Sequence, residues 1–370
     1  MRKLFVLFAA ALLACGLVVQ APAAAHAQAK KKLKVAFVLL ESVNDHGWTE
    51  AHAEAISYLQ KEMGDQVDVA WTENIVSPTD AERVMRDYAQ KGYDIVFGTT
   101  FGYMDVMAKL SKEFPKTHWD HCSGYKTTSN MGNYFARMYQ AEYLAGYMAG
   151  LMGYKNVGTV ATQPIPEPIR GINAFTIGLV KGLKEAGVKY DENKVDTVVW
   201  LKSWRDAQGE TTLAETLAGR GHDLIRQMAD TPDTSKAACA AGVPAIGYGM
   251  DAARYGADCA LVSTAWNWGP YYVRQVKAVQ NGTWKPEAYW EGFSADMVKL
   301  SPFGKKVPEA VRTKVEAELE KLRKGQDDIF MGPLYDQSGK LIVPAGKKVS
   351  DQDLLTKRFF VKGVSGTIPE

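Results

Sequence analysis

Aromatic side chains and carboxylate or amide groups occur together directly after several predicted β-strands. Asn44, Asp45 and Trp48 follow the first strand, and Trp200 and Trp204 follow a later one. An aromatic face stacks on a flat ring, and carboxylates and amides hydrogen bond along the edge of such a ring. A small-molecule site combines apolar surface with a few polar groups. The pattern therefore predicts a site for a small planar ligand, formed by Trp48, Trp204, Asn44, Asp45, Phe101, Tyr103, Tyr125, Asn173, Trp200, Asp230, Asp251 and Trp268.

Each of these residues also has a purely structural interpretation. A loop aspartate or asparagine usually caps a helix or forms a turn, and an isolated tryptophan more often fills a core. The prediction depends instead on how many strand ends, in both halves of the chain, carry such groups. In open parallel α/β sheets, ligands bind at the carboxyl ends of the strands, which is where these residues are expected.

Catalytic motifs are missing from the sequence. It contains no P-loop, no G-x-S-x-G elbow, no H-E-x-x-H and no G-x-G-x-x-G after the first strand. It also lacks a C-x-x-C pair and any metal-type spacing of Cys and His. We therefore expect a binding protein without a cofactor or metal, rather than an enzyme.

Short strands alternate with helices through most of the chain. Leu33 to Leu40 is a continuous apolar run, as expected for a parallel strand covered on both faces. The alternation predicts an α/β fold with βαβ units on parallel sheets. Further strands are expected at residues 67–72, 94–99, 118–123, 156–161, 196–200, 224–228, 245–249 and 297–300, and helices at 48–63, 79–91, 104–113, 140–152, 172–186, 211–219 and 271–280.

The alternation of strands and helices occurs in two successive halves of the chain, which predicts two Rossmann-like lobes. Lobe I is expected to comprise residues 33–126 and 264–288, and lobe II residues 127–263 and 289–330, because the pattern shortens after Leu261 as if the chain recrosses between lobes. Residues 331–370 are expected to form a C-terminal extension, in which Asp336-Gln337-Ser338-Gly339 forms the turn of a hairpin.

The N-terminus has the features of a secretory signal peptide. A basic start at Arg2-Lys3 precedes an apolar run, and Ala25-His26-Ala27 offers a cleavage site, so residues 1–27 are expected to be removed on export to the periplasm. Lipidation of Cys15 is the alternative, since Leu12-Leu13-Ala14-Cys15 is similar to a lipidation box.

Charge and cysteine content narrow the expected partners and covalent links. The chain has 44 Lys and Arg against 42 Asp and Glu, a balance that gives no reason to expect a nucleic acid. An exported protein can form disulfides. Cys239 and Cys259 are close enough to close a modest loop and would leave Cys122 over, although the spacing equally permits free thiols.

Several segments, in the same order along the chain, resemble the basic membrane protein (BMP) family of ABC-transporter substrate-binding proteins. The similarity covers essentially the whole chain after the signal peptide, and Asp336-Gln337-Ser338-Gly339 matches the family's C-terminal extension. The segments are Asn44-Asp45-His46-Gly47-Trp48, Phe101-Gly102-Tyr103-Met104-Asp105, His121-Cys122-Ser123-Gly124-Tyr125, Pro166-Glu167, Gly171-Ile172-Asn173-Ala174-Phe175, Ser203-Trp204-Arg205-Asp206, Trp268-Gly269-Pro270-Tyr271-Tyr272 and Gly282-Thr283-Trp284.

The resemblance implies a type I periplasmic-binding fold, in which two lobes joined by three hinge crossings close on the ligand. It also implies a purine ligand, an ABC permease in the inner membrane as partner, and a monomer. Trp48 and Trp204 take the positions of the family's ring-stacking aromatics. The family's polar positions fall on Asn44 and Asp45 in the first lobe and on Asp230 and Asp251 in the second.

Two segments depart from the family's nucleoside binders. Ala229-Asp230-Thr231-Pro232-Asp233 stands where those proteins tend to have Gly-Gly-Thr-Gly, and Ala265-Trp266-Asn267-Trp268 stands where they tend to hold a ribose-contacting lysine. A free base such as adenine is therefore expected in preference to a nucleoside. Two alternatives remain: an exported nucleosidase-like enzyme that uses Asp45 or Asp230, and a ligand-sensing partner of a membrane signalling receptor.

Overall fold

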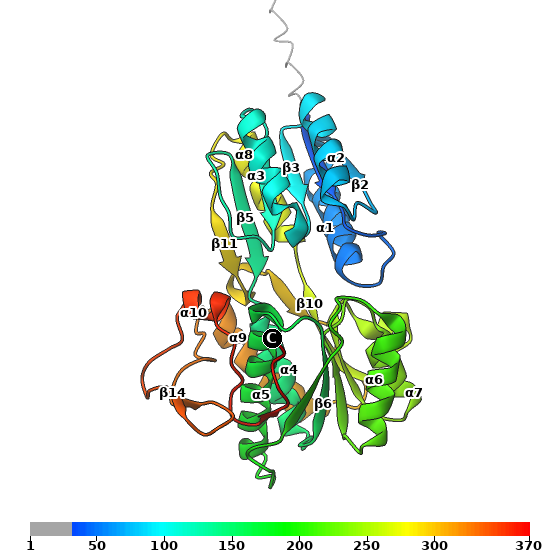
Figure 1. The fold of residues 1–370 in the computed structure, drawn as a ribbon, viewed down its shortest axis with the longest axis vertical. Coiled ribbons are helices and arrows are strands. Elements are labelled where there is room, and N and C mark those ends of the chain that lie inside the picture. The colour runs from blue at the N-terminus through cyan, green and yellow to red at the C-terminus, as the bar shows by residue number, and fades with distance from the viewer. Residues whose placement is uncertain (1–31) are drawn as a thin grey trace, which may run out of the picture. The chain divides into compact units, whose positions relative to one another are not determined.

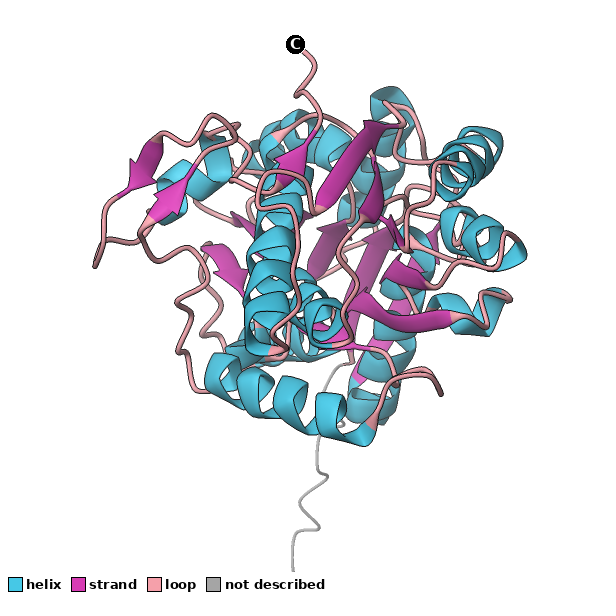
Figure 2. Ribbon diagram, turned by 90° about the horizontal axis from the view of Figure 1, so that it is seen from below, coloured by secondary structure: helices cyan, strands magenta, loops and turns pink. Residues whose placement is uncertain are grey.

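The computed structural model describes residues 32–370, which form one compact unit containing two separate parallel-rich sheets. Figure 1 shows the path of the chain, and Figure 2 shows the strands lying between layers of helices. The expected signal peptide and the lipidation alternative at Cys15 fall outside the described residues.

The first sheet, which defines lobe I, is entirely parallel. Its order is β11-β5-β4-β3-β1-β2. The strands are β1 (Leu33–Val38), β2 (Val67–Thr72), β3 (Ile95–Gly98), β4 (His118–Cys122), β5 (Met131–Ala136) and β11 (Ala288–Glu291), and the helices are α1 (Trp48–Met63), α2 (Pro78–Gln90), α3 (Met104–Glu113) and α8 (Gly269–Gln280).

The apolar run at the start of the chain accounts for the layering of lobe I. Successive side chains of a strand point to opposite faces of the sheet. Val35 and Phe37 pack into the core that contains residues of α1 and α8, whereas Ala36 and Val38 pack into the core formed with α2 and α3. A strand covered on both faces must be apolar throughout, as this one is.

The second sheet, which defines lobe II, has the order β12-β10-β9-β8-β6-β7-β15, and only β12 runs antiparallel to its neighbour. Its strands are β6 (Val157–Ala161), β7 (Asp196–Trp200), β8 (Leu224–Gln227), β9 (Ala245–Gly249), β10 (Ala260–Trp266), β12 (Val298–Leu300) and β15 (Val364–Ser365), and its helices are α4 (Tyr139–Leu151), α5 (Pro166–Glu185), α6 (Ala207–Gly219), α7 (Asp233–Ala240) and α9 (Glu309–Arg323).

Glycines bring α4 and α5 unusually close together. A Cβ atom on Gly146 would lie 2.0 Å from the carbonyl oxygen of Phe175, and one on Gly178 would lie 2.1 Å from that of Tyr143. Larger side chains would force the two backbones apart. This helix pair therefore needs glycine at these positions to pack as it does.

Three connections cross between the sheets, at residues 137–138, 267–268 and 292–297. The boundaries therefore differ from the expected ones: β5 and all of β11 belong to lobe I, and Thr264 to Trp266 complete β10 in lobe II. The sequence of β5 contains Gly132 and Asn133, which are poor strand formers. The strand exists because it pairs with β4 on one side and β11 on the other.

Most expected elements lie where the sequence places them, and α1, β2, α3, β7 and β9 have the expected bounds. Several elements were not expected, among them β5, α7, β11, α9, β15 and a short helix at Asp351–Thr356. Helix α5 begins at Pro166, six residues before the expected start at Ile172, and proline is well tolerated in the first turn of a helix.

The C-terminal extension contains the expected hairpin, with β13 (Leu334–Tyr335) antiparallel to β14 (Leu341–Val343). It continues through α10 (Asp351–Thr356) to β15, which pairs with β7 at the edge of the lobe II sheet. The extension is therefore part of lobe II. A disulfide links Cys239 in α7 to Cys259, and the remaining described cysteine, Cys122, is buried and free.

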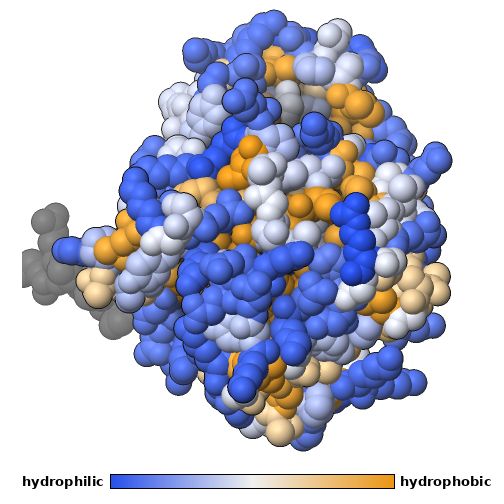
Figure 3. Space-filling view, turned by 60° about the horizontal axis from the view of Figure 1, so that its bottom comes forward, coloured by the Kyte–Doolittle hydropathy of each residue, from blue (hydrophilic) through white to orange (hydrophobic). Residues whose placement is uncertain are grey.

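The surface is mixed in character. Figure 3 shows hydrophilic residues over most of the face in view, with small hydrophobic patches between them. Within residues 32–370, no helix combines the length and the apolar composition that a bilayer crossing requires.

Candidate functional site

The two lobes touch where α1 begins. Gly47 lies directly before α1 in lobe I, and a Cβ atom there would lie 1.7 Å from the carbonyl oxygen of Asp230 in lobe II. The backbone N–H of Asp230 donates to the carbonyl oxygen of Trp204 at 2.9 Å. Trp48, Asp230 and Trp204 therefore flank one junction, although they come from different lobes.

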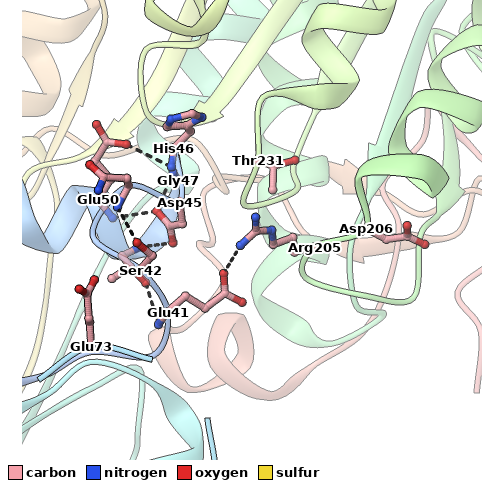
Figure 4. A network of polar contacts seen from close by, with 12 residues as sticks. Glu41, Ser42, Asp45, His46, Gly47, Glu50, Glu73, Arg205, Asp206 and Thr231 are labelled. Carbon is pink, nitrogen blue, oxygen red and sulfur yellow. Dashed lines mark hydrogen bonds and ion pairs between the residues drawn. The ribbon is translucent and has the colours of Figure 1, made fainter. Parts of the chain in front are cut away.

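Polar side chains connect the lobes around this junction, as Figure 4 shows for one of them. The guanidinium of Arg205 donates to the carboxylate of Glu41 across the interface. Further along α1, the Tyr255 hydroxyl donates to Glu50 at 2.5 Å, and the rings of His46 and Tyr255 stack at 4.4 Å. Contacts of this kind describe lobes that are closed on each other.

Trp48 is half-buried, and its indole N–H donates to the carbonyl oxygen of Thr99 at the end of β3, at 2.8 Å. Its ring meets Trp266 edge to face at 5.4 Å and Trp268 at 5.8 Å. Trp266 and Trp268 stack on each other at 4.9 Å at the second crossing. Trp266 and Trp268, the aromatic residues at this crossing, thus hold the Trp48 ring in position.

Trp204 is held differently. It lies in the loop between β7 and α6, and 43% of it is exposed. The neighbouring Asp206 caps α6 by accepting from the backbone N–H of Gly209 at 3.0 Å. This cap fixes the loop while the indole itself stays accessible.

Asp230 has an unusual electrostatic environment. No donor among residues 32–370 hydrogen bonds to its carboxylate. Burial raises the pKa of Asp230 well above its ordinary value, and the nearby carboxylates of Asp45 and Glu167 raise this pKa further. A carboxyl group in such a place needs a donor or a proton to offset its burial.

Glu167 and Tyr248 form a second polar pair on the lobe II side. The Tyr248 hydroxyl donates to the Glu167 carboxylate at 3.2 Å, and the Tyr248 ring meets Trp266 edge to face at 5.9 Å. Burial raises the pKa of Glu167, while Arg170 acts in the opposite direction. Together with Asp230, this pair gives the lobe II side of the junction an acidic character.

Two predicted carboxylates cap helices. Asp45 accepts hydrogen bonds from the backbone N–H groups of Gly47 at 3.0 Å, Thr49 at 2.8 Å and Glu50 at 2.9 Å. Asp251 accepts from Ala253 at 3.2 Å, at the start of a 3-10 turn. The capping of α1 matters for the site because it sets the position of Trp48.

Four predicted residues do not face the lobe junction. The Tyr103 hydroxyl is buried and donates to the carbonyl oxygen of Ile75. Trp268 is fully buried in the aromatic cluster described above. Asn173 and Trp200 instead bind the C-terminal extension: Asn173 contacts the backbone of Phe359 and Val361, and the Trp200 indole donates to Thr367 at 2.7 Å.

The remaining predicted residues are exposed. Asn44 lies in the loop before α1, where its backbone N–H donates to the Ser42 hydroxyl at 3.3 Å. Phe101 and Tyr125, which follow β3 and β4, are 55% and 71% exposed, and their rings lie 6.3 Å apart. They form an accessible aromatic pair at the strand ends of lobe I.

Several residues at this junction were not predicted from the sequence. Glu41, Arg205, Tyr248 and Tyr255 contribute contacts there, yet none was predicted to bind ligand. Arg205 directly follows Trp204, so its position next to a predicted site residue was the available signal. Glu41, Tyr248 and Tyr255 each lie more than 80 residues from their partners, and no sequence motif marks them.

Other features of the described chain do not suggest chemistry. Within residues 32–370, no group of three or more His, Cys, Asp or Glu side chains is arranged to hold a metal ion. Two surface hollows of about 400 and 600 Å³ lie beside α9 and along α2, and none of the predicted ligand-binding residues lines either of them.

Comparison with known proteins places the chain among solute-binding proteins. Residues 32–328 match the family described as "Bmp: ABC transporter substrate-binding protein PnrA-like". A purine-binding protein of Brucella abortus is 36% identical over 345 residues, which cover 93% of this chain and 96% of that protein. A putative ABC transporter glucose-binding protein of Haloferax volcanii is 33% identical over 339 residues, which cover 91% of this chain and 81% of that protein.

Solved structures share the fold at lower identity. A solute-binding protein of an ABC transporter system from Conexibacter woesei has a TM-score of 0.66 at 24% identity, covering 80% of this chain and 97% of its own. A periplasmic solute-binding protein from Actinobacillus succinogenes with bound D-allose has a TM-score of 0.54 at 12% identity, covering 76% and 100%. The fold is that of type I periplasmic-binding proteins, as expected.

Proposed function

Because this chain belongs to the Bmp family of ABC transporter substrate-binding proteins, we propose that it binds a purine between its two lobes. Members of this family bind small molecules for a membrane permease and are not enzymes. The relative from Brucella abortus is named a purine-binding protein, which supports a purine as the ligand. A free base such as adenine is the proposed ligand, in preference to a nucleoside.

The arrangement of two tryptophans is the observation that carries this proposal. Trp48 starts α1 in lobe I, and Trp204 lies in a loop of lobe II whose backbone adjoins the same junction. Stacking of a base on an aromatic side chain contributes roughly 1–3 kcal/mol. A ring held between the two indoles would gain this on both faces only when the lobes are closed, so the ligand would shift the equilibrium toward closure.

The residues around the second crossing favour a bare base over a nucleoside. Trp266 and Trp268 are almost fully buried and pack against Trp48, so their bulk occupies the space beside the proposed stacking position. A ribose would need additional room and polar partners there. The acidic groups Asp230 and Glu167 would instead accept hydrogen bonds from N–H groups on the edge of the base.

The proposed partner is an ABC permease, which would receive the ligand from the closed form. Proteins of this family are typically periplasmic or extracellular, and we propose that this one is a periplasmic monomer. Because Gly47 contacts Asp230 in the closed arrangement, a ligand would enter only after the lobes separate.

A sugar is the second candidate ligand, because one relative of similar identity is named as a putative glucose-binding protein. The proposed stacking favours a flat heterocycle over a sugar. Calorimetric titration with adenine, adenosine and glucose would separate these candidates.

The experiment that tests the proposal compares Trp204→Ala with Trp71→Ala. Trp71 is a matched control, since it is 46% exposed on β2, at the edge of the lobe I sheet. We expect Trp204→Ala to weaken adenine binding about five- to hundredfold, or beyond detection, because one stacking face is lost. Circular dichroism should show both variants folded. Unchanged affinity for every purine tested in Trp204→Ala would refute the proposal.

A further inference from the structure

The C-terminal extension, residues 331–370, lies beyond residue 328, where the match to the family model ends. Its last part is tied to lobe II. Strand β15 pairs with β7, and Asn173 on α5 contacts the backbone of both Phe359 and Val361, at 2.8 and 2.9 Å. Lobe II therefore holds this end of the extension in place.

Helix α10 of the extension contacts the first crossing between the lobes. Both carboxylate oxygens of Asp351 accept hydrogen bonds from the guanidinium of Arg137, at 2.9 and 2.5 Å. Arg137 is the residue that directly follows β5, and only 16% of its side chain is exposed. Its hydrogen bond lowers the pKa of Asp351, which keeps the pair ionised at neutral pH.

The same arginine is bound to lobe I at the third crossing. Its backbone N–H donates to the carbonyl oxygen of Glu291 at 2.8 Å, and its Nε donates to that of Trp290 at 2.8 Å. The guanidinium also lies 4.1 Å from the centre of the Trp290 ring. Arg137 thus joins two of the three crossings, and Asp351 joins both of them to an extension held by lobe II. Figure 1 shows α10 at the level of these crossings.

From these contacts we infer that the C-terminal extension braces the hinge and favours the closed arrangement of the lobes. A closing motion changes the backbone torsion angles of a few residues at the crossings. The Asp351–Arg137 pair is present in the closed arrangement, in which Arg205 binds Glu41 and Tyr255 binds Glu50. The pair therefore stabilises the closed arrangement. Opening would rotate β5 and β11 relative to an extension that stays with lobe II, and would strain or break the pair.

The test is Asp351→Asn, with Asp353→Asn as the matched control. Asp353 is on the same helix and has the same charge, but its carboxylate pairs with Lys357, the residue directly after that helix, and not with the hinge. The lobe separation would be measured without ligand, from spin labels on Lys112→Cys in α3 and Glu215→Cys in α6. Both sites are exposed, Cys122 is buried and Cys239 is paired with Cys259, so in protein that begins after the expected signal peptide the labels react with the new thiols.

We expect Asp351→Asn to raise the ratio of open to closed molecules about fivefold, as loss of a bidentate ion pair at a partly buried site would do. Asp353→Asn should match the parent protein, and Asp351→Glu should restore most of the closed population. Identical distance distributions for Asp351→Asn and the parent would overturn the inference, and so would an equal shift in Asp353→Asn.

Ligand affinity provides a second measurement, and its interpretation rests on the proposed function. If only a fraction of the protein is binding-competent, the apparent dissociation constant rises in inverse proportion to that fraction. Adenine binding to Asp351→Asn should therefore weaken by the factor found from the distances. The distances between the labels are measured without ligand and do not depend on which ligand binds. Failure of the proposed hinge contact would therefore appear in the distances, whereas failure of the proposed ligand would appear only in the adenine affinity.

Discussion

At the scale of single residues, the carboxyl group of Asp230 is the most informative. It is partly exposed and lies near the carboxylates of Asp45 and Glu167, and none of residues 32–370 donates a hydrogen bond to it. A carboxyl group at a junction between lobes, with a raised pKa and no donor in the protein, is a candidate to accept a hydrogen bond from a ligand. In contrast, Asp45 appeared equally suitable in the sequence, but its carboxylate is fully engaged by three backbone N–H groups of α1.

Asp230→Asn should weaken purine binding about tenfold or more, because a hydrogen bond to a charged group contributes roughly 1.5–3 kcal/mol. The matched control is Asp251→Asn, a predicted polar position on the same lobe whose carboxylate caps a 3-10 turn. Titration calorimetry would measure both affinities. An affinity of Asp230→Asn equal to that of the parent protein would show that the Asp230 carboxylate does not contact the ligand.

Asp120 should make the stability of the protein depend on pH. It is buried on β4 and accepts from the Tyr271 hydroxyl at 2.8 Å, and burial raises its pKa to about 8. The folded state therefore holds a proton that the unfolded state releases above an ordinary pKa near 3.8. This contribution is fully present below that ordinary value and is lost as the pH rises toward 8, by at most about 1.4 kcal/mol per pH unit.

Asp120→Asn keeps an acceptor for Tyr271 and removes the titration. Urea unfolding at pH 5.5, 7 and 8.5 should show that the variant gains stability relative to the parent as the pH rises. Asp87→Asn, a change on the exposed face of α2, should leave the pH profile of the parent unaltered. A constant difference between Asp120→Asn and the parent across this range would contradict the assignment.

At the scale of elements, the site depends on how helix starts and loops are fixed. Asp45 holds the start of α1 and so sets Trp48, while Asp206 caps α6 and so fixes the loop of Trp204. In lobe II, the disulfide between Cys239 and Cys259 joins α7 to the segment directly before β10. Each device restrains a short segment next to a strand end.

The disulfide should stabilise lobe II by restricting its unfolded state. The two cysteines are 20 residues apart, and a loop of this size corresponds to about 3 kcal/mol in the chain-entropy account. We expect the double variant Cys239→Ala and Cys259→Ala to lose about 2–4 kcal/mol in free energy of unfolding. A reductant should lower the stability of the parent similarly and leave the double variant unchanged, whereas equal sensitivity to reductant would count against this role.

At the scale of the whole molecule, pairs that cross between the lobes determine the balance between open and closed forms. Arg205 with Glu41, Tyr255 with Glu50, and Arg254 with Glu54 all join lobe II to lobe I. These pairs are partly exposed, so each one contributes only about 0.2–1 kcal/mol. A weak set of contacts is suitable for a molecule that must open to release its ligand.

Glu41→Gln should weaken ligand binding about two- to fivefold at low salt, because the closed form loses its pair with Arg205. The difference from the parent should shrink in 1 M salt, where the screening length is roughly 3 Å. Lys236→Ala is the control, since Lys236 pairs with Asp233 within one helix of lobe II. A salt-independent effect of Glu41→Gln would point to direct contact with the ligand instead.

The local pattern of the sequence was enough to predict the two α/β lobes and most of their elements. Apolar runs such as that of β1 and the regular return of helices record burial and periodicity, which are properties of neighbouring residues. Family resemblance, carried by segments such as Ser203-Trp204-Arg205-Asp206, indicated the fold and the placing of the stacking residues on separate lobes.

Only the tertiary structure decided which residues at the strand ends come together. Asn173 and Trp200 were predicted to bind a ligand, yet they hold the extension through partners 186 and 167 residues away. Arg205 and Glu41 meet across 164 residues and were not predicted. Local sequence carries no record of such contacts, because they depend on strand register, on where the chain crosses between sheets, and on how the lobes close.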